Sequence, residues 1–179
     1  TQLVKVSALE LIEIVLPLRE PFVTTSGSRF ERRVLLLRAE GEEGREGWGE
    51  CVAGEEPTYS YETTDTAWHV LTTYLLQPLV GLEILSPGDI EALLRPVRGH
   101  PMAKAAGEMA LWDLQARELE APLWELLGGS GESVAAGVVV GLAPTLDALV
   151  HTIEQYVEAG YARIKLKVGR DRDLEWLAA

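Results

Sequence analysis

The sequence predicts an α+β domain over residues 1–130, followed by the opening part of an α/β domain over residues 131–179. Three observations predict this order. Apolar runs of strand length come first, longer stretches with apolar residues three and four apart follow them, and a strand–helix–strand pattern ends the chain. The 179 residues are enough for one good core, or for one domain and a piece of a second.

Three segments near the N-terminus are predicted to be strands. Residues 4–16 begin with alternating apolar and polar side chains, and residues 33–38 form a short apolar run between charges. Residues 47–52 follow a turn rich in Gly and Glu, so that the second and third segments predict a hairpin. The stretch 17–31 is polar and predicts a connecting loop, and loops of that length are often functional.

Helical periodicity then extends to about residue 127. One helix is expected to end near Pro78, and the segment Ser86–Asp89 offers a capping hydroxyl and a first-turn proline to a second. The longest helix is expected to begin at Pro101, and a short one over residues 122–127 to end at Gly128. The stripe predicted to be buried on the longest helix consists of Met102, Ala105, Ala106, Met109, Trp112, Ala116 and Leu119.

The pattern beyond Gly131 predicts a βαβ unit. Residues 134–141 form a near-continuous apolar run, which is typical of a strand buried on both faces of a parallel sheet. A helical stripe over residues 146–157 follows, and residues 162–168 form a second strand. A third helix is expected to begin at Asp173.

The composition excludes several classes of partner. A net charge of −12 disfavours nucleic acid and anionic membrane surfaces, and no apolar run approaches the ~18 residues of a membrane span. The first residues lack the basic-then-apolar pattern of a signal peptide. Cys51 is the only cysteine, which excludes an intrachain disulfide and fits a reducing cytoplasm; we expect it to be buried. The three histidines lack metal-binding spacing and are assigned structural or surface roles: His69, His100 and His151.

Lys165 and Lys167 are the most informative candidates for chemistry. Positions two apart on a strand share a face, and two like charges disfavour each other's protonated form. A lysine of such a pair in a dry pocket can act as a general base. Arg163 shares this face, so carboxylates are expected elsewhere in the site. The alternative is an edge strand protected by lysines against aggregation, which is less favoured because a strand after a crossover helix is seldom an exposed edge.

Five blocks carry a resemblance that covers nearly all of the chain. The sequence resembles the N-terminal portion of the muconate lactonising subgroup of the enolase superfamily. Within it, the sequence is most similar to o-succinylbenzoate synthases that also racemise N-acylamino acids. The blocks are Pro17–Phe22, Gly47–Cys51, Gly99–Lys104, Met109–Leu114 and Gly160–Lys167. They correspond to only about half of a typical member.

The resemblance implies a fold and a mechanism. Residues 1–130 would form a capping domain, a three-stranded antiparallel sheet plus a helical bundle, and residues 131–179 the first two β/α units of a modified TIM barrel. Lys167 would abstract the proton α to a carboxylate, and Lys165 would tune its partner and help to hold the carboxylate. Mg²⁺ (or Mn²⁺) would stabilise the enediolate, as is general for this superfamily. Its ligands lie on later strands of relatives, so no metal ligand is assigned in this chain.

Two loops of the capping domain set specificity in relatives, and they match residues 22–28 and 52–61. The positions that correspond to substrate contacts are Phe22, Thr25, Ser26, Gly54, Tyr59 and Val139. For the two aromatic residues, core packing or partial exposure is an equally weighted alternative. Ser26 stands where a close type of relative has a second loop aromatic, Gly54 stands near where some relatives carry methionine, and Val139 replaces a serine of racemising relatives. These departures put the racemase activity in doubt more than the synthase activity.

The implied enzyme is a carbon–oxygen lyase, o-succinylbenzoate synthase of menaquinone biosynthesis, or a racemase. It would act on a small carboxylate in the cytoplasm as a homo-oligomer. One alternative changes the reaction to that of a muconate cycloisomerase or dipeptide epimerase. The other is an inactive fragment without a metal site, because a β/α barrel needs eight strands.

Overall fold

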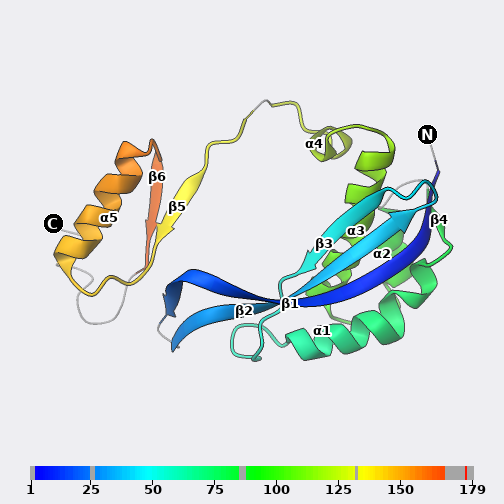
Figure 1. Cartoon of the computed structure of the whole chain (residues 1–179), viewed down its shortest axis with the longest axis horizontal. Coiled ribbons are helices and arrows are strands. Elements are labelled where there is room, and N and C mark those ends of the chain that lie inside the picture. Colours follow the sequence, from blue (N-terminus) through cyan, green and yellow to red (C-terminus); the bar gives the residue numbers. More distant parts are fainter. Residues whose placement is uncertain (1–2, 25–26, 85–87, 132, 168–175, 177–179) are drawn as a thin grey trace. The chain divides into compact units, whose positions relative to one another are not determined.

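The computed structural model describes residues 3–24, 27–84, 88–131, 133–167 and 176. The chain divides into two compact units. The first consists of Thr1–Leu16 and Arg32–Ser130, and the second of Pro17–Glu31 and Gly131–Ala179. Figure 1 labels the helices and strands of both units.

The sheet has four strands in the order β3-β2-β1-β4 (Figure 1). They are β1 (Val4–Thr24), β2 (Gly27–Gly41), β3 (Glu46–Cys51) and β4 (Glu83–Ile84). Strands β2 and β3 pair antiparallel over Leu35–Glu40, which confirms the predicted hairpin. The contacts Glu13–Arg33, Glu10–Arg38 and Ser7–Glu40 run in opposite directions along β1 and β2, so these strands are also antiparallel. The sequence indicated only three strands, because two residues are too short to give β4 a periodic pattern.

The predicted loop over residues 17–31 is wrong in its described part. Strand β1 continues through residues 17–24 and β2 begins at Gly27. Polar residues can form strands when a neighbouring strand pairs with their backbone groups, and Val23 and Thr24 are residues of high β-propensity. Pairing between β1 and β2 is a tertiary effect that the composition of this stretch did not indicate.

Four helices of the first unit follow the predicted order. Helix α1 (Thr64–Val70) continues as a π-helical turn over Leu71–Leu75 and a 3-10 turn over Gln77–Leu79. Helices α2 (Asp89–Leu94), α3 (Pro101–Glu118) and α4 (Leu123–Leu126) follow. Gly128, with φ 80°, ends the last of these as predicted. Ser86 and Pro87, proposed to cap α2, lie outside the described residues.

The predicted stripe of helix α3 is only partly right: Ala106 and Ala116 are buried, but other members of the stripe are not. Met109 is 41% and Leu119 37% exposed, whereas small residues face the sheet. A Cβ on Gly49 would lie 2.1 Å from the Ala106 carbonyl oxygen, and one on Gly47 2.2 Å from that of Ala110. The helix and β3 therefore touch backbone to backbone, which leaves no room for Met or Trp between them. The fully buried residues of α3 are Ala103, Ala106, Ala110, Leu111 and Leu114.

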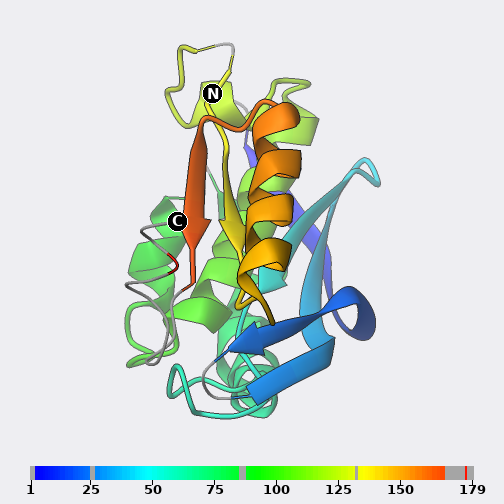
Figure 2. The same ribbon diagram turned by 90° about the vertical axis from the view of Figure 1, so that its left-hand side faces the viewer.

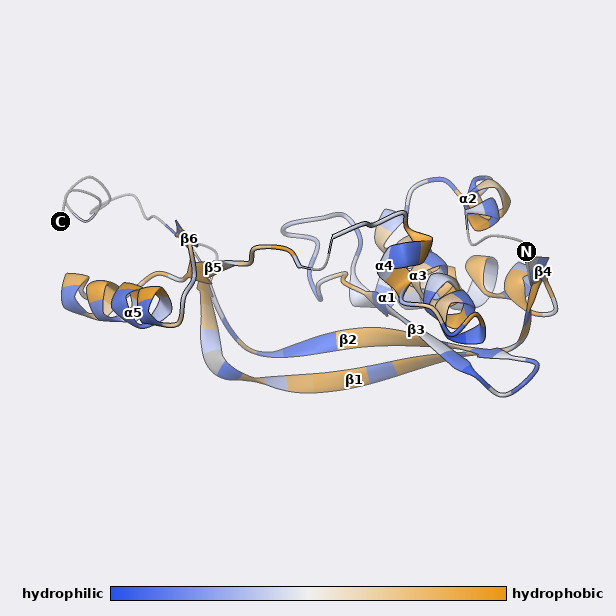
Figure 3. Ribbon diagram, turned by 90° about the horizontal axis from the view of Figure 1, so that it is seen from above, coloured by the Kyte–Doolittle hydropathy of each residue, from blue (hydrophilic) through white to orange (hydrophobic). Residues whose placement is uncertain are grey.

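The core of the first unit lies between the sheet and these helices, which share one face of it (Figure 3). Leu35 and Leu37 of β2, Leu71 and Leu75 of the π-helical turn, and Ile90 of α2 are at most 1% exposed. Cys51 belongs to this core, as predicted, and burial raises the pKa of its thiol.

The second unit contains the predicted βαβ arrangement, with β5 (Gly137–Val140), α5 (Leu146–Glu158) and β6 (Arg163–Leu166). The two strands are parallel, with Gly137 opposite Arg163 and Val140 opposite Leu166. Figure 2 shows α5 beside this pair, with Thr145 capping its first turn through the Ala148 N–H. The predicted third helix at Asp173 lies outside the described residues.

The prediction that the first of these strands is buried on both faces is wrong for this chain. Val140 is 5% exposed but Val139 is 48% exposed. Helix α5, whose apolar side carries the buried Leu149, contacts β5, and one helix can cover only one face of a sheet (Figure 3). None of the helices in the described part of the chain is long and apolar enough to cross a membrane.

Candidate active site

Lys167 lies immediately after β6 in the second unit. Its backbone N–H donates to the Val140 carbonyl at 3.0 Å, which extends the pairing of β5 and β6 by one residue. This bond fixes the backbone at the carboxyl end of the strand, the end at which β/α folds place their reactive groups. The side chain of Lys167 is partly buried.

The Lys167 ammonium lies over the ring of Phe22, with Nζ 3.7 Å from the ring centroid. This is cation–π geometry, in which the positive charge faces the negative face of the ring. Phe22, from the Pro17–Glu31 segment of the same unit, is 49% exposed. The sequence assigned one residue to acid–base chemistry and the other to substrate contact, and the structure brings them together. No sequence pattern could have shown this contact, because the two residues are far apart in the chain.

Lys165 is paired in register with Val139, so these two candidates are neighbours across the parallel strands. The side chains of Lys165 and Arg163 are exposed, whereas Ile164 and Leu166 are partly buried. The expectation that the cationic face is buried is therefore wrong for this chain. The described part of this sheet has only the strands β5 and β6, and α5 packs on it, so nothing described covers the face that carries Lys165 and Arg163. The catalytic roles of both lysines stay predictions.

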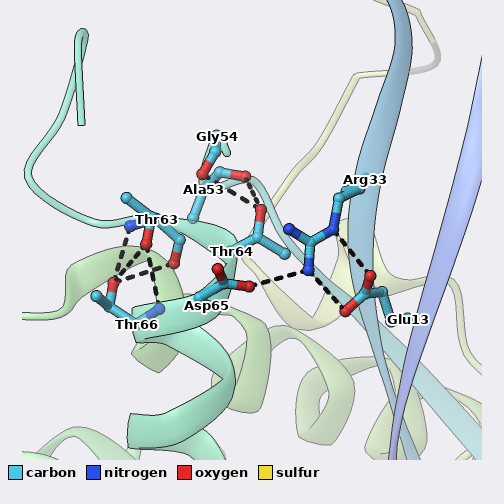
Figure 4. A network of polar contacts seen from close by, with 8 residues as sticks. All are labelled: Glu13, Arg33, Ala53, Gly54, Thr63, Thr64, Asp65 and Thr66. Atoms are coloured by element: carbon cyan, nitrogen blue, oxygen red, sulfur yellow. Dashed lines mark hydrogen bonds and ion pairs between the residues drawn. The ribbon is translucent and has the colours of Figure 1, made fainter. Parts of the chain in front are cut away.

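The segment 52–61, predicted to be a specificity loop, belongs to the first unit and has a rigid base. Gly54 forms an isolated bridge with Thr63, and its carbonyl accepts the Thr64 N–H at 2.7 Å. The hydroxyl of Thr64, which is 1% exposed, also donates to the carbonyls of Gly54 and Ala53 (Figure 4). Tyr59 is 96% exposed, so the alternative that it packs in the core is wrong.

Arg33 joins three elements beside this base (Figure 4). Its guanidinium donates to both carboxylate oxygens of Glu13, at 2.9 and 3.1 Å, and to Asp65 at 2.9 Å. Bidentate pairing of this kind is geometrically specific and stronger than a neutral hydrogen bond. It holds the pKa of Glu13 below its usual range and raises the pKa of Arg33 further. Strands β1 and β2 are thereby tied to the first turn of α1.

Glu62 is a buried residue that the sequence did not single out. Its carboxylate, with the residue 1% exposed, accepts the backbone N–H groups of Met102 at 2.8 Å and Ala103 at 3.1 Å. A carboxylate at the first turn of a helix satisfies unpaired donors and interacts favourably with the helix dipole. Glu62 therefore attaches the end of the 52–61 segment to α3. His100 precedes the helix at φ 54°, with Nδ1 4.0 Å from the same carboxylate.

Thr25 and Ser26 lie outside the described residues. Within the described ranges, no three His, Cys, Asp or Glu side chains are grouped so that they could hold a metal ion. The described residues therefore offer no ligand set for the divalent cation that the resemblance implies.

The fold defines a class. An antiparallel sheet with helices is followed in the sequence by a parallel βαβ unit, as in the N-terminal part of enolase-superfamily proteins. Residues 8–128 match the family model "Mandelate racemase / muconate lactonizing enzyme, N-terminal domain". The chain belongs to this family, and the resemblance inferred from the sequence is confirmed.

Relatives cover almost the whole chain. It is 41% identical over 175 residues to an N-succinylamino acid racemase of Thermus thermophilus. The aligned residues make up 98% of this chain and 47% of the relative. It is 38% identical over 165 residues to an o-succinylbenzoate synthase of Geobacillus kaustophilus, covering 92% and 44%. An enolase-superfamily structure from Listeria innocua superposes with a TM-score of 0.90 at 33% identity, covering 97% and 47%. The chain thus spans about half the length of the relatives it matches.

Proposed function

We propose that the full-length protein abstracts the α-proton of a succinyl-bearing carboxylate, as an o-succinylbenzoate synthase or an N-succinylamino acid racemase. The observation that carries the proposal is the position of Lys167, fixed at the carboxyl end of β6 by the bond to Val140. The relatives support the substrate class, because the names of both the synthases and the racemases contain a succinyl group.

In the proposed reaction, the neutral amine of Lys167 takes the proton from the carbon next to the substrate carboxylate. In the synthase reaction, a hydroxide then leaves the neighbouring ring carbon and the ring becomes aromatic. In the racemase reaction, an acid on the far side of the substrate, from outside the residues described, would give a proton to the opposite face of the same carbon, while Lys167 keeps the one it took. Lys165 would contribute positive charge near the carboxylate, where negative charge develops. Mg²⁺ would supply further stabilisation of that charge, with ligands from outside the residues described.

The rival reactions are less favoured by similarity. An L-Ala-D/L-Glu epimerase of Bacillus subtilis is 27% identical, and a muconate lactonizing enzyme of Pseudomonas fluorescens is 24% identical. Synthase and racemase relatives reach 38% and 41%. This similarity does not separate synthase from racemase, whereas the departures at Ser26, Gly54 and Val139 favour the synthase. A homo-oligomer and a cytoplasmic location remain parts of the proposal.

The test is α-proton exchange. Full-length protein with Mg²⁺ is incubated in D₂O with an N-succinylamino acid, and loss of the α-proton signal is followed by NMR. Conversion of a hydroxylated succinyl-cyclohexadiene carboxylate to o-succinylbenzoate is measured in parallel by absorbance. We expect dehydration, with exchange on the succinylated amino acid as a second activity. Absence of both reactions, with either a dipeptide or a muconate turned over instead, contradicts the proposal.

A further inference from the structure

We propose that Glu62 is a positioning residue: its buried carboxylate anchors the exposed stretch 55–60, the tip loop, so that Tyr59 meets a bound ligand in a fixed place. The proton transfer proposed above does not use this carboxylate. The anchor stands on geometry, whereas the contact between Tyr59 and a ligand rests on the proposed function. Glu62 would then set the affinity for the ligand without touching it.

The tip loop is closed at its base. The carbonyl of Gly54 accepts the Thr64 N–H at 2.7 Å and Gly54 forms an isolated bridge with Thr63, so the chain leaves and re-enters the first unit at one place (Figure 4). Residues 55–59 are exposed between these ends, and Tyr59 is 96% exposed. Surface loops whose ends lie close together are frequently functional. With a side chain this exposed, Tyr59 takes its position from its backbone.

Glu62 fastens the returning end of the tip loop to α3. Its carboxylate accepts the N–H groups of Met102 and Ala103, and its own N–H donates to the Ser60 hydroxyl at 3.2 Å. Ser60 is the chain neighbour of Tyr59, so this second bond reaches the residue next to the aromatic side chain. The start of α3 and the tip loop are therefore connected through one residue.

The origin of this carboxylate indicates that it does more than cap a helix. Burying a charge is costly, and a helix that needs only a cap can take Ser, Thr, Asp or Asn at its own N-cap position. In the described part of the chain, His100 occupies that position and makes no capping bond with its side chain. The cap comes instead from a residue 40 positions before Met102, and its side chain is fully buried. A buried charge that is satisfied in only one place specifies one arrangement of the two segments.

The anchor lowers the cost of ligand binding. An exposed aromatic side chain on a loose loop must be ordered when a ligand binds, and this loss of freedom subtracts from the affinity. A loop that is already held in the bound position avoids part of the cost. Loss of the anchor should therefore raise KM and leave kcat nearly unchanged, because the contact is lost alike in the bound substrate and in the transition state.

The anchor is tested by limited digestion of the full-length protein with chymotrypsin under native conditions. The rate of cleavage after Tyr59 is followed by mass spectrometry and divided by that for the free peptide of the same sequence. We expect Glu62→Gln to raise this ratio roughly fivefold or more, the change in an opening equilibrium that follows from one lost buried hydrogen bond. The matched control is Ile90→Val in α2. Ile90 is 0% exposed, so this variant loses a comparable free energy of unfolding but keeps the anchor.

A second variant serves if Glu62→Gln does not fold. Ser60→Ala removes only the acceptor of the Glu62 N–H, and we expect it to raise the cleavage ratio by a smaller factor. A wild-type ratio in the folded variant, or an equal rise in Ile90→Val, refutes the anchor.

The positioning role is tested by steady-state kinetics of the full-length protein on the two succinyl-bearing substrates named above. We expect KM to rise roughly three- to tenfold in Glu62→Gln with kcat within about twofold of the wild type, and neither to change in Ile90→Val. Tyr59→Ala should raise KM in the wild type but add little in the Glu62→Gln background, because both changes remove the same contact. Equal KM values in Glu62→Gln and Ile90→Val, or an equal effect of Tyr59→Ala in both backgrounds, contradict the positioning role.

The two proposals fail separately. If Glu62→Gln loosens the tip loop but the wild type turns over neither substrate, the anchor stands and the proposed function is wrong. If the wild type turns over substrate while Glu62→Gln and Ile90→Val have the same KM, the enzyme stands and the positioning role is wrong.

Discussion

The two units differ in how much of each is packed. The entire buried core cluster, from Val4 to Leu114, lies in the first unit. Among the described residues of the second unit, only Val140 and Leu149 are buried. Yet the second unit holds Lys167, the candidate for proton transfer, and Phe22, whose ring it contacts. In this chain, which spans about half the length of the relatives it matches, the packed core and the candidate for proton transfer therefore lie in different units.

The largest expected effect is on chemistry in the second unit. In the full-length protein, Lys167→Met keeps the length of the side chain and removes the amine. We expect kcat for α-proton exchange to fall by about 10²–10⁴-fold, the usual contribution of a general base. The free energy of unfolding should stay within about 0.5 kcal/mol of the wild type, because Lys167 is no part of a buried core. Exchange kinetics and urea unfolding measure the two effects.

The control for this substitution is Lys5→Met in the first unit. Lys5 is partly exposed and pairs with Glu42 on the surface, so its loss should leave exchange unchanged. A Lys167→Met enzyme that retains exchange within a factor of three would remove the lysine from the mechanism and, with it, the assignment of chemistry to the second unit.

The next effect is on packing in the first unit. Gly49→Ala places a Cβ 2.1 Å from the Ala106 carbonyl oxygen, and that atom belongs to a helix backbone that cannot move alone. We expect a loss of about 3 kcal/mol in the free energy of unfolding, at the upper end of overpacking effects. Gly141→Ala in the second unit, where a Cβ meets nothing within 4 Å, should change it by less than about 0.5 kcal/mol. Equal losses in the two variants would mean that the second unit is packed as tightly as the first.

The same contrast explains what could be predicted from the sequence. Periodicity and turn residues gave the element order, the β2–β3 hairpin and the βαβ unit, because these depend on local pattern. The buried face of α3 was only partly predicted, because it is decided by contact with Gly47 and Gly49 of a distant strand. The contact between Phe22 and Lys167 and the role of Glu62 depend likewise on residues far apart in the chain.

Glu62→Gln tests the attachment of the 52–61 segment within the first unit. An amide is nearly isosteric with the carboxylate, but it replaces one of the two accepting oxygens by an NH₂ group, which then faces one of the two N–H donors of α3. We expect a loss of about 1–2 kcal/mol in the free energy of unfolding, typical of a lost helix cap. Amide hydrogen exchange should rise at Met102 and Ala103, whose N–H groups bond to Glu62. Glu91→Gln, at an exposed position of α2, is the control. Unchanged exchange at both amides would show that the carboxylate does not hold the helix.

The smallest effect is the pH dependence of the Glu13–Arg33 pair. The pKa of Glu13 is lowered in the folded protein below its ordinary value of 4.5, chiefly by the hydrogen bonds from Arg33. A lowered folded-state pKa means that the stabilisation is complete above the unfolded value and is lost as the pH falls through the folded one. The free energy of unfolding of the wild type should therefore exceed that of Glu13→Gln at pH 6, and the difference should shrink towards pH 3. The difference is small at any pH, because the Glu13 side chain is 35% exposed and solvent screens the pair. A difference that is the same at pH 6 and pH 3 would show that Glu13 acts by packing alone, and that the link between β1, β2 and α1 in Figure 4 does not depend on its charge.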